Sequence, residues 1–234
     1  MFSLMLLFLF AGCVASDNFG DKPDIFFTRI SEHQDIFFTR MSEQDSREST
    51  VKISAHTEDA IYGGSGFYFF YKGEPVVLTA AHVVENAESI FVIRNEDVIL
   101  ANVVYIDIKS DLAVLSAPRM ADWGATGFKL STKIPKVGEE CFYSGFPNDG
   151  TMMTLGGHVA GYTISGDIIL NSYAWSGASG SAVFNRRGEI IGVVSAIEIG
   201  IDYLGFPTMI QNVVVVAPLT RLDYNTLDKA LLGG

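Results

Sequence analysis

From Val51 to Val216 the sequence consists of short runs of β-branched and aromatic residues separated by turn residues, and this pattern constrains the fold most. Residues 51–55 alternate between apolar and polar side chains, residues 66–71 form a dense aromatic run, and Lys72-Gly73-Glu74 has the composition of a hairpin turn. Long helical periods are missing between the runs, which argues against alternating strand–helix units and predicts an all-β fold. Further strand-like runs cover residues 76–80, 89–94, 98–106, 112–115, 140–143, 157–164, 167–171, 182–184, 190–196 and 212–216.

The strand-like runs fall into two halves, separated by a loop-like stretch from Trp123 to Thr132. We predict one domain over residues 49–234, with a first β-barrel over 49–122 and a second over 130–217. A short C-terminal helix is expected over residues 218–232, because apolar side chains recur on one helical face after a proline and two glycines follow. These side chains are Leu219, Leu222, Leu227, Ala230 and Leu231.

Composition excludes two classes of protein. Of the 234 residues 48% are hydrophobic and 18% are charged, which is ample material for a packed core and argues against a disordered chain. The net charge of −11 repels phosphate backbones, so we expect no nucleic-acid partner.

The N-terminus indicates export. Residues 2–14 are almost purely apolar, too short to span a bilayer but typical of the core of a signal peptide, so residues 1–15 are predicted to be a signal peptide or lipoprotein signal. Leu9-Phe10-Ala11-Gly12-Cys13 resembles the bacterial lipobox, which would make Cys13 a lipidated membrane anchor. The alternatives are simple secretion after cleavage near Ala15, an uncleaved anchor, or a misassigned start.

A tandem repeat lies in the spacer expected over residues 16–48. Residues 24–34 and 35–45 share eight of eleven positions around Ile-Phe-Phe-Thr-Arg. Two copies are too few for a solenoid. We interpret them as a duplication in a linker; the alternative is that one copy docks on the barrel or binds a partner.

Three residues with the chemistry of acyl transfer occur in an informative order. Ser179 is flanked by Gly177 and Gly180, and small neighbours let backbone N–H groups converge on one point. We assign Ser179 as nucleophile, His82 as its base and Asp111 as the residue that orients the base. The N–H groups of Gly177 and Ser179 are predicted to form an oxyanion hole.

Each of these assignments has a rival. Asp107 competes with Asp111, Ser176 and Ser181 compete with Ser179, and His82 could be a core histidine. His33, His56 and His158 have no such context and are interpreted as structural or surface residues. Cys141 lies in a strand-like run and is interpreted as a buried hydrophobic residue rather than a reactive thiol. No metal site and no cofactor are expected from these spacings.

These segments together resemble the trypsin-like serine peptidases, and in particular their bacterial Deg (HtrA-like) branch. Thr79-Ala-Ala-His82 is similar to the family's His motif, Asp111-Leu-Ala-Val-Leu115 to its Asp motif, and Gly177-Ala-Ser179-Gly-Ser181 to its nucleophile motif. The resemblance covers residues 49–231 and implies a chymotrypsin-like pair of six-stranded antiparallel barrels and a serine endopeptidase that takes polypeptide substrates.

The sequence departs from the Deg pattern at the nucleophile. Ala178 and Ser181 stand where Asn and a second Gly are usual, a change that keeps the N–H donors and so is compatible with activity. Too few residues follow Ser179 for a PDZ module. The remaining alternative is a catalytically inactive protein of the same fold that acts as a surface binding module.

The same resemblance implies a specificity pocket lined by Tyr173 and the strand Ser195-Ala196-Ile197. Tyr173 cannot supply the charge that Lys or Arg substrates require, and Val194 replaces the His of the glutamyl peptidases. We therefore expect cleavage after small or medium apolar residues such as Val, Ala or Leu.

Overall fold

The computed structural model describes residues 43–120, 123, 128–201 and 207–233. The expected signal segment, Cys13 and the first repeat copy lie outside these residues, as does most of the second copy.

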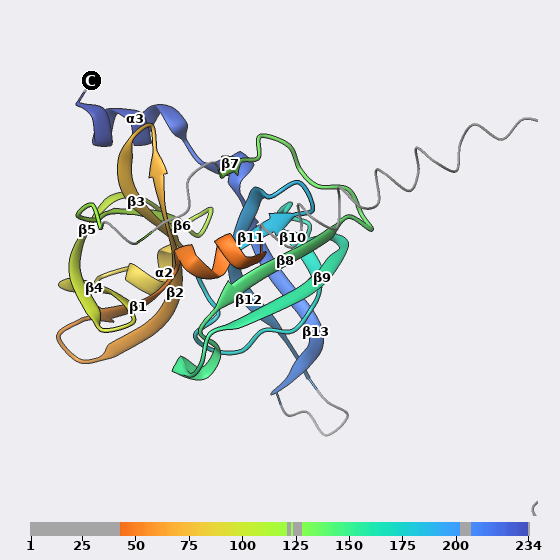
Figure 1. Cartoon of the computed structure of the whole chain (residues 1–234). Coiled ribbons are helices and arrows are strands. Elements are labelled where there is room, and N and C mark those ends of the chain that lie inside the picture. The colour runs from red at the N-terminus through yellow and green to blue at the C-terminus, as the bar shows by residue number, and fades with distance from the viewer. Residues whose placement is uncertain (1–42, 121–122, 124–127, 202–206, 234) are drawn as a thin grey trace, which may run out of the picture.

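The first half of the described chain forms a closed antiparallel barrel with strand order β1-β2-β3-β6-β5-β4 (Figure 1). Val51, Ile53, Val77 and Leu115 fill its interior and are fully buried. The strands are β1 (Thr50–His56), β2 (Ile61–Tyr71), β3 (Glu74–Thr79), β4 (Ser89–Arg94), β5 (Asp97–Asp107) and β6 (Leu112–Ser116).

The second half forms another six-stranded antiparallel barrel, in the order β11-β8-β9-β10-β13-β12, which the pairing of β11 with β12 closes. The prediction of two six-stranded barrels is therefore confirmed. A two-residue strand, β7 (Lys129–Leu130), adds to β12 in parallel and was not predicted, because two residues carry no recognisable period. The barrel strands are β8 (Glu140–Gly145), β9 (Met153–Tyr162), β10 (Ile168–Asn171), β11 (Ala182–Asn185), β12 (Glu189–Ile201) and β13 (Pro207–Pro218).

An aromatic cluster joins the barrels. Phe67 of β2 contacts Phe184 of β11 edge to face, with ring centroids 5.2 Å apart, and Phe142 of β8 stacks on the other side of Phe184 at 5.3 Å. Phe128, from the segment between the barrels, contacts Phe67 at 5.0 Å. Such pairs are worth about 0.5–1.5 kcal/mol each beyond their buried area, so this cluster holds the two barrels together. A separate apolar cluster fills the second barrel.

The C-terminal helix forms as predicted but begins later. Residues 219–221 form a 3-10 turn, η2 (Leu219–Arg221), and α3 (Tyr224–Leu232) starts after Asp223, whose carboxylate accepts hydrogen bonds from two backbone N–H groups of the first turn. The helix returns to the first barrel, where Asp228 bonds to the Tyr71 hydroxyl (3.0 Å) and to Lys72 Nζ (2.7 Å).

A helix over residues 43–49, drawn in orange between the barrels in Figure 1, precedes β1. The described fold therefore begins before residue 49, where we expected the domain to start. The helix packs through polar contacts: Ser46 is fully buried with its Oγ 3.2 Å from Ser144 Oγ, and Arg47 donates to Thr154 Oγ1 at 2.8 Å. Because it presents hydroxyls rather than an apolar stripe to the barrel, its sequence lacks the period that indicates a helix.

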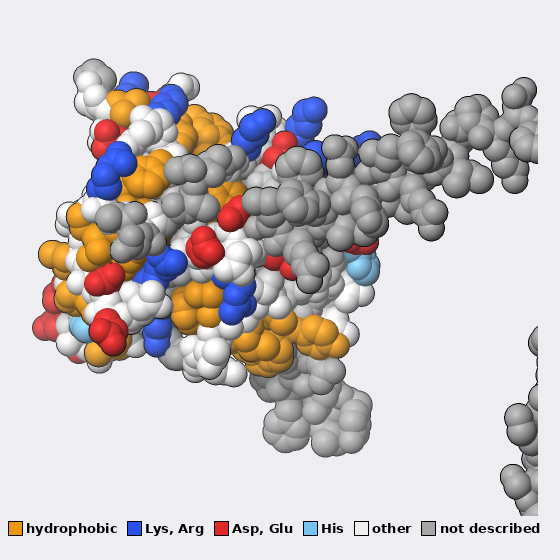
Figure 2. Space-filling view, in the orientation of Figure 1, with side chains coloured by type: hydrophobic (Ala, Val, Ile, Leu, Met, Phe, Trp, Pro, Cys, Tyr) orange, Lys and Arg blue, Asp and Glu red, His pale blue; other side chains and the backbone are white. Residues whose placement is uncertain are grey.

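Charged side chains of both signs alternate with apolar ones on the face shown in Figure 2. Among the described residues, no helix is long and apolar enough to cross a membrane.

Two glycines of β9 provide a matched test of the second barrel. A Cβ added to Gly157 would lie 2.3 Å from the Asn171 carbonyl oxygen, whereas one added to Gly161 would meet nothing within 4 Å. We expect Gly157→Ala to lower the free energy of unfolding by about 1–3 kcal/mol, because the β10 backbone must move. Gly161→Ala should change it by less than about 0.5 kcal/mol. Urea denaturation of both variants tests this, and equal effects would contradict the packing described.

Candidate active site

His82 stands on a short helix, α2 (Ala81–Val84), that follows β3 directly. Ala81, Val83 and Val84 are buried against the first barrel. The histidine side chain is 45% exposed, so the helix holds the imidazole at the surface while its neighbours anchor it.

Asp111 faces this imidazole from the turn between β5 and β6. Its Oδ1 and Oδ2 lie 3.0 and 2.9 Å from His82 Nδ1, and Oδ1 also accepts the His82 backbone N–H at 2.9 Å. Asp107, the sequence rival, instead accepts the N–H groups of Lys109 and Ser110 and stabilises the turn. The structure therefore brings Asp111, and not Asp107, to His82.

Ser195 is the third partner of the Asp111 carboxylate. The pairing of β12 with β13 shifts register between Val194 and Ala196, so Ser195 lies in a β-bulge. Its hydroxyl donates to Asp111 Oδ2 at 2.5 Å. Sequence reasoning assigned Ser195 only to the substrate pocket, because a bulge that redirects one side chain leaves no signal in a strand-like run.

The pKa of Asp111 lies below its ordinary value. Burial alone would raise it, but hydrogen bonds from His82 and Ser195, together with the His82 backbone N–H and the positive charge that His82 can carry, outweigh burial. The carboxylate is therefore ionised at neutral pH, which is the state that holds an imidazole by its Nδ1–H.

Ser179 lies on the loop that joins β10 to β11 of the second barrel, and it is half-buried. Its carbonyl accepts the Ser65 N–H from β2 at 2.8 Å, and the next residue, Gly180, donates to the Val194 carbonyl of β12 at 2.8 Å. The two serines that compete with Ser179 as nucleophile differ from it in exposure. Ser181 is fully buried and Ser176 is exposed.

Gly64 of β2 lies close to both the loop that carries Ser179 and the helix that carries His82. A Cβ built on Gly64 would lie 2.6 Å from Val83 Cγ1 and 3.2 Å from the Ser179 carbonyl oxygen, so the two segments approach the same point of β2. In the described part of the chain, no hydrogen bond joins the Ser179 hydroxyl to the His82 ring. Such bonds are often long without substrate and shorten in the complex.

Two backbone N–H groups of the Ser179 loop have no acceptor among the described residues. Gly177 has a φ of +88°, which glycine adopts without strain. Neither the Gly177 nor the Ser179 N–H donates to another described residue, although Gly177 is buried. Unpaired N–H donors beside a candidate nucleophile are what an oxyanion hole requires, and the assignment of these two groups to one stays a prediction.

The structure describes some, but not all, of the side chains expected to line the specificity pocket. The Tyr173 side chain is 52% exposed and stacks on Trp175 with ring centroids 6.2 Å apart, while its carbonyl accepts the hydroxyl of buried Tyr143. Ala196 is exposed, and the Ile197 side chain lies outside the described residues. Their role in specificity stays a prediction.

Other titratable residues do not build a second centre within the described ranges. Cys141 is buried, and burial, with Glu139 and Glu140 nearby, raises the pKa of its thiol to about 12, which agrees with a hydrophobic role. His56 lies near Ser54 Oγ and packs on Phe91. No group of three or more His, Cys, Asp or Glu side chains in the described part of the chain could hold a metal ion.

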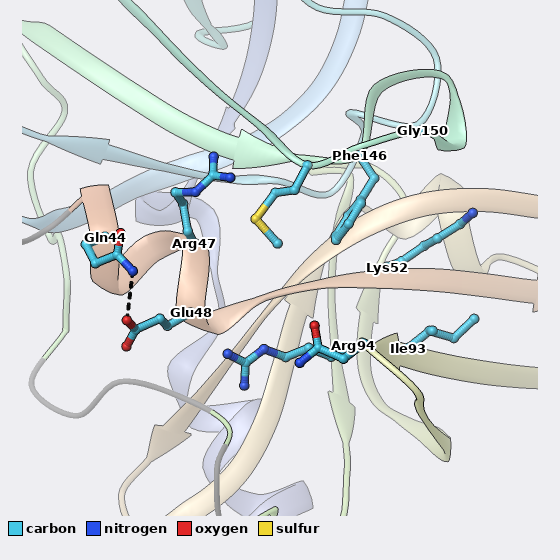
Figure 3. A pocket seen from close by; sticks show the side chains of 10 residues that line it. Gln44, Arg47, Glu48, Lys52, Ile93, Arg94, Phe146 and Gly150 are labelled. Carbon is cyan, nitrogen blue, oxygen red and sulfur yellow. Dashed lines mark hydrogen bonds between the residues drawn. The ribbon is translucent and has the colours of Figure 1, made fainter.

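A cavity of about 500 Å³ lies between helix 43–49, strands β1 and β4, and the turn between β8 and β9 (Figure 3). No triad candidate lines it. Its walls are Gln44, Arg47, Glu48, Lys52, Ile93, Arg94, Asn95, Phe146, Gly150 and Met152.

Comparison with solved structures identifies the same fold. A serine endoprotease from Yersinia pestis superposes with a TM-score of 0.65 at 20% identity, covering 84% of this chain and 67% of that one. The Rv3671c protease from M. tuberculosis, in an inactive form, gives a TM-score of 0.59 at 19% identity over 77% of this chain and 86% of that one.

Sequence comparison agrees. A probable periplasmic serine endoprotease of DegP-like type from Halomonas elongata is 31% identical over 152 residues, or 61% of this chain, and the match covers only 31% of that relative's length. The profile of the trypsin-like peptidase domain matches residues 64–193, a span that contains His82, Asp111 and Ser179. Since this match extends over more than half of the sequence, the chain belongs to the trypsin-like peptidase family.

Proposed function

We propose that the chain is a serine endopeptidase in which Ser179, His82 and Asp111 form the catalytic triad. The observation that supports this most is the paired approach of both Asp111 carboxylate oxygens to His82 Nδ1, at 3.0 and 2.9 Å, next to a loop with two unpaired N–H groups. An ionised carboxylate at Nδ1 selects the tautomer whose Nε2 can accept a proton.

The reaction then follows from these groups. His82 Nε2 accepts the Ser179 hydroxyl proton as Oγ attacks the peptide carbonyl, and the Gly177 and Ser179 N–H groups stabilise the oxygen that becomes negative. His82 returns the proton to the leaving amine, which leaves an acyl group on Ser179. A water molecule, deprotonated by the same imidazole, releases the acyl group as a carboxylate and restores the serine.

The substrates we propose are polypeptides cleaved after small or medium apolar residues. Supporting this, neither Tyr173 nor Ala196 carries a charge that would select Lys, Arg or Glu side chains. Nucleic acid and cofactors have no part in the proposed reaction.

We further propose that the protein is exported. The apolar residues 2–14 and the lipobox-like Cys13 support a cell-envelope lipoprotein, with secretion as the alternative. The Halomonas relative is named as periplasmic, which agrees with either route.

Labelling with a fluorophosphonate probe tests the nucleophile. The probe should modify the wild-type protein, and Ser179→Ala should abolish labelling and lower kcat by roughly 10⁶-fold. Ser176→Ala, three residues away and exposed, is the matched control and should label normally. A folded wild-type protein that neither labels nor cleaves peptides would favour the inactive binding module.

The choice between the two aspartates is tested by amide substitution. Asp111→Asn should lower kcat by about 10⁴-fold, because the amide no longer selects the reactive tautomer of His82. Asp107→Asn keeps an oxygen that can accept the turn N–H groups, so its kcat should stay near the wild-type value. Steady-state kinetics on one peptide substrate compares them, and the reverse order would remove Asp111 from the triad.

Specificity is tested with a mixed peptide library digested by wild-type protein, with Ser179→Ala as the blank. Cleavage products read by mass spectrometry should end mainly in Val, Ala or Leu. Products that end in Arg, Lys or Glu would refute the apolar preference without touching the triad.

A further inference from the structure

Ser65 of β2 is fully buried and makes three hydrogen bonds to two segments of the second barrel, the Ser179 loop and the turn that begins at Phe146. Its Oγ donates to the Gly177 carbonyl at 2.7 Å and accepts the Phe146 N–H at 2.9 Å. Its own N–H donates to the Ser179 carbonyl at 2.8 Å. One residue of the first barrel therefore touches both residues whose N–H groups we assign to the oxyanion hole.

The direction of those N–H groups depends on three successive peptide planes. In a trans peptide the N–H points opposite to the preceding C=O, so holding the oxygen of one residue fixes the N–H of the next. The Ser176 oxygen accepts the Asn148 N–H at 2.5 Å, which sets the Gly177 N–H. The Ala178 oxygen accepts the Ser181 N–H at 3.1 Å, which sets the Ser179 N–H.

The plane between these two is held by a side chain. The Gly177 oxygen bonds to the Ser65 hydroxyl, and glycine lacks the Cβ that would otherwise restrict rotation of this plane. The same plane carries the Ala178 N–H, which donates to the Trp175 carbonyl at 3.0 Å, so the plane is held at both ends. Without the Ser65 hydroxyl it would be held at one end, and a shift at the Gly177 Cα would displace the Gly177 N–H beside it. Of the four hydrogen bonds that hold these three planes, the one from Ser65 is made by a side chain and the other three by backbone N–H groups. A substitution at Ser65 can therefore loosen the loop without changing the backbone donors.

Ser65 also couples the loop to the turn between β8 and β9. Phe146 begins this turn and Asn148 lies within it, so the same short segment holds Ser176 directly and Gly177 through Ser65. Phe146 also lines the cavity of Figure 3, with helix 43–49 on the opposite side.

We propose that Ser65 is a positioning residue of the oxyanion hole, whose hydroxyl anchors the Gly177 carbonyl to the turn that begins at Phe146. The inference rests on the proposed peptidase function. Ser65 touches no reacting atom; it acts through the loop.

The test is Ser65→Ala in the full-length protein. A misplacement of about 1 Å at a catalytic group costs about 10²-fold in rate, so kcat should fall by about 10–100-fold with little change in KM. Inhibition by a peptidyl aldehyde, whose hemiacetal oxygen occupies the oxyanion hole, should weaken by the same factor as kcat/KM. Binding of the uncleaved peptide, measured in a Ser179→Ala background, should be unaffected by Ser65→Ala.

Ser131→Ala is the matched control. Ser131 is also buried, and its Oγ likewise donates to a carbonyl and accepts a backbone N–H, but both belong to Lys133 and neither to the Ser179 loop. Its removal should leave kcat and aldehyde affinity unchanged. If Ser65→Ala does not fold, Ser65→Cys is decisive, because a thiol fills similar space but donates only weakly.

The outcomes separate the two hypotheses. A wild-type protein that resists the fluorophosphonate and cleaves no peptide refutes the peptidase function itself. A wild-type protein that labels and cleaves, beside a folded Ser65 variant with unchanged kcat and aldehyde affinity, overturns only the role of Ser65. Equal losses in kcat/KM and in uncleaved-peptide binding would assign Ser65 to substrate binding and also overturn the inference.

Discussion

The seam between the barrels depends on the backbone of the Ser179 loop, which bonds on one side to Ser65 of β2 and on the other to Val194 of β12. His82 and Asp111 belong to the first barrel, whereas Ser179 and Ser195 belong to the second. Any shear between the barrels would separate Ser179, the proposed nucleophile, from His82, its proposed base. The aromatic contact between Phe67 and Phe184 opposes such shear from the core. The geometry of the candidate site and the packing of the barrels thus depend on the same interface.

Electrostatics strengthens this interface at one carboxylate. Asp111 accepts hydrogen bonds from His82 in its own barrel and from Ser195 in the other. Each donor lowers the pKa of Asp111 against the opposing effect of burial. A fully solvated carboxylate would select one imidazole tautomer less firmly, because water would compete as a donor to its oxygens. The partly buried position of Asp111 therefore serves orientation as well as charge.

Two features were predictable from sequence for clear physical reasons. Short apolar runs separated by turn residues indicate strands, and this pattern predicted both barrels. Acyl transfer requires a small set of residue types in a known order, and this requirement predicted His82, Asp111 and Ser179 as candidates. Helix 43–49 and β7 were missed because one packs through hydroxyls and the other has two residues. The contacts of Ser65 and Ser195 arise from long-range closure and from a bulge, neither of which leaves a local pattern.

The path of the last helix has a consequence for how the chain matures. α3 follows the final strand of the second barrel, yet it packs on the first, where Asp228 bonds to Tyr71 and Lys72. Synthesis proceeds from the N-terminus, and early segments start to fold first. The first barrel therefore lacks the contacts of α3 until residues 224–232 have been made. Completion of the first barrel in this way depends on a segment that follows the second.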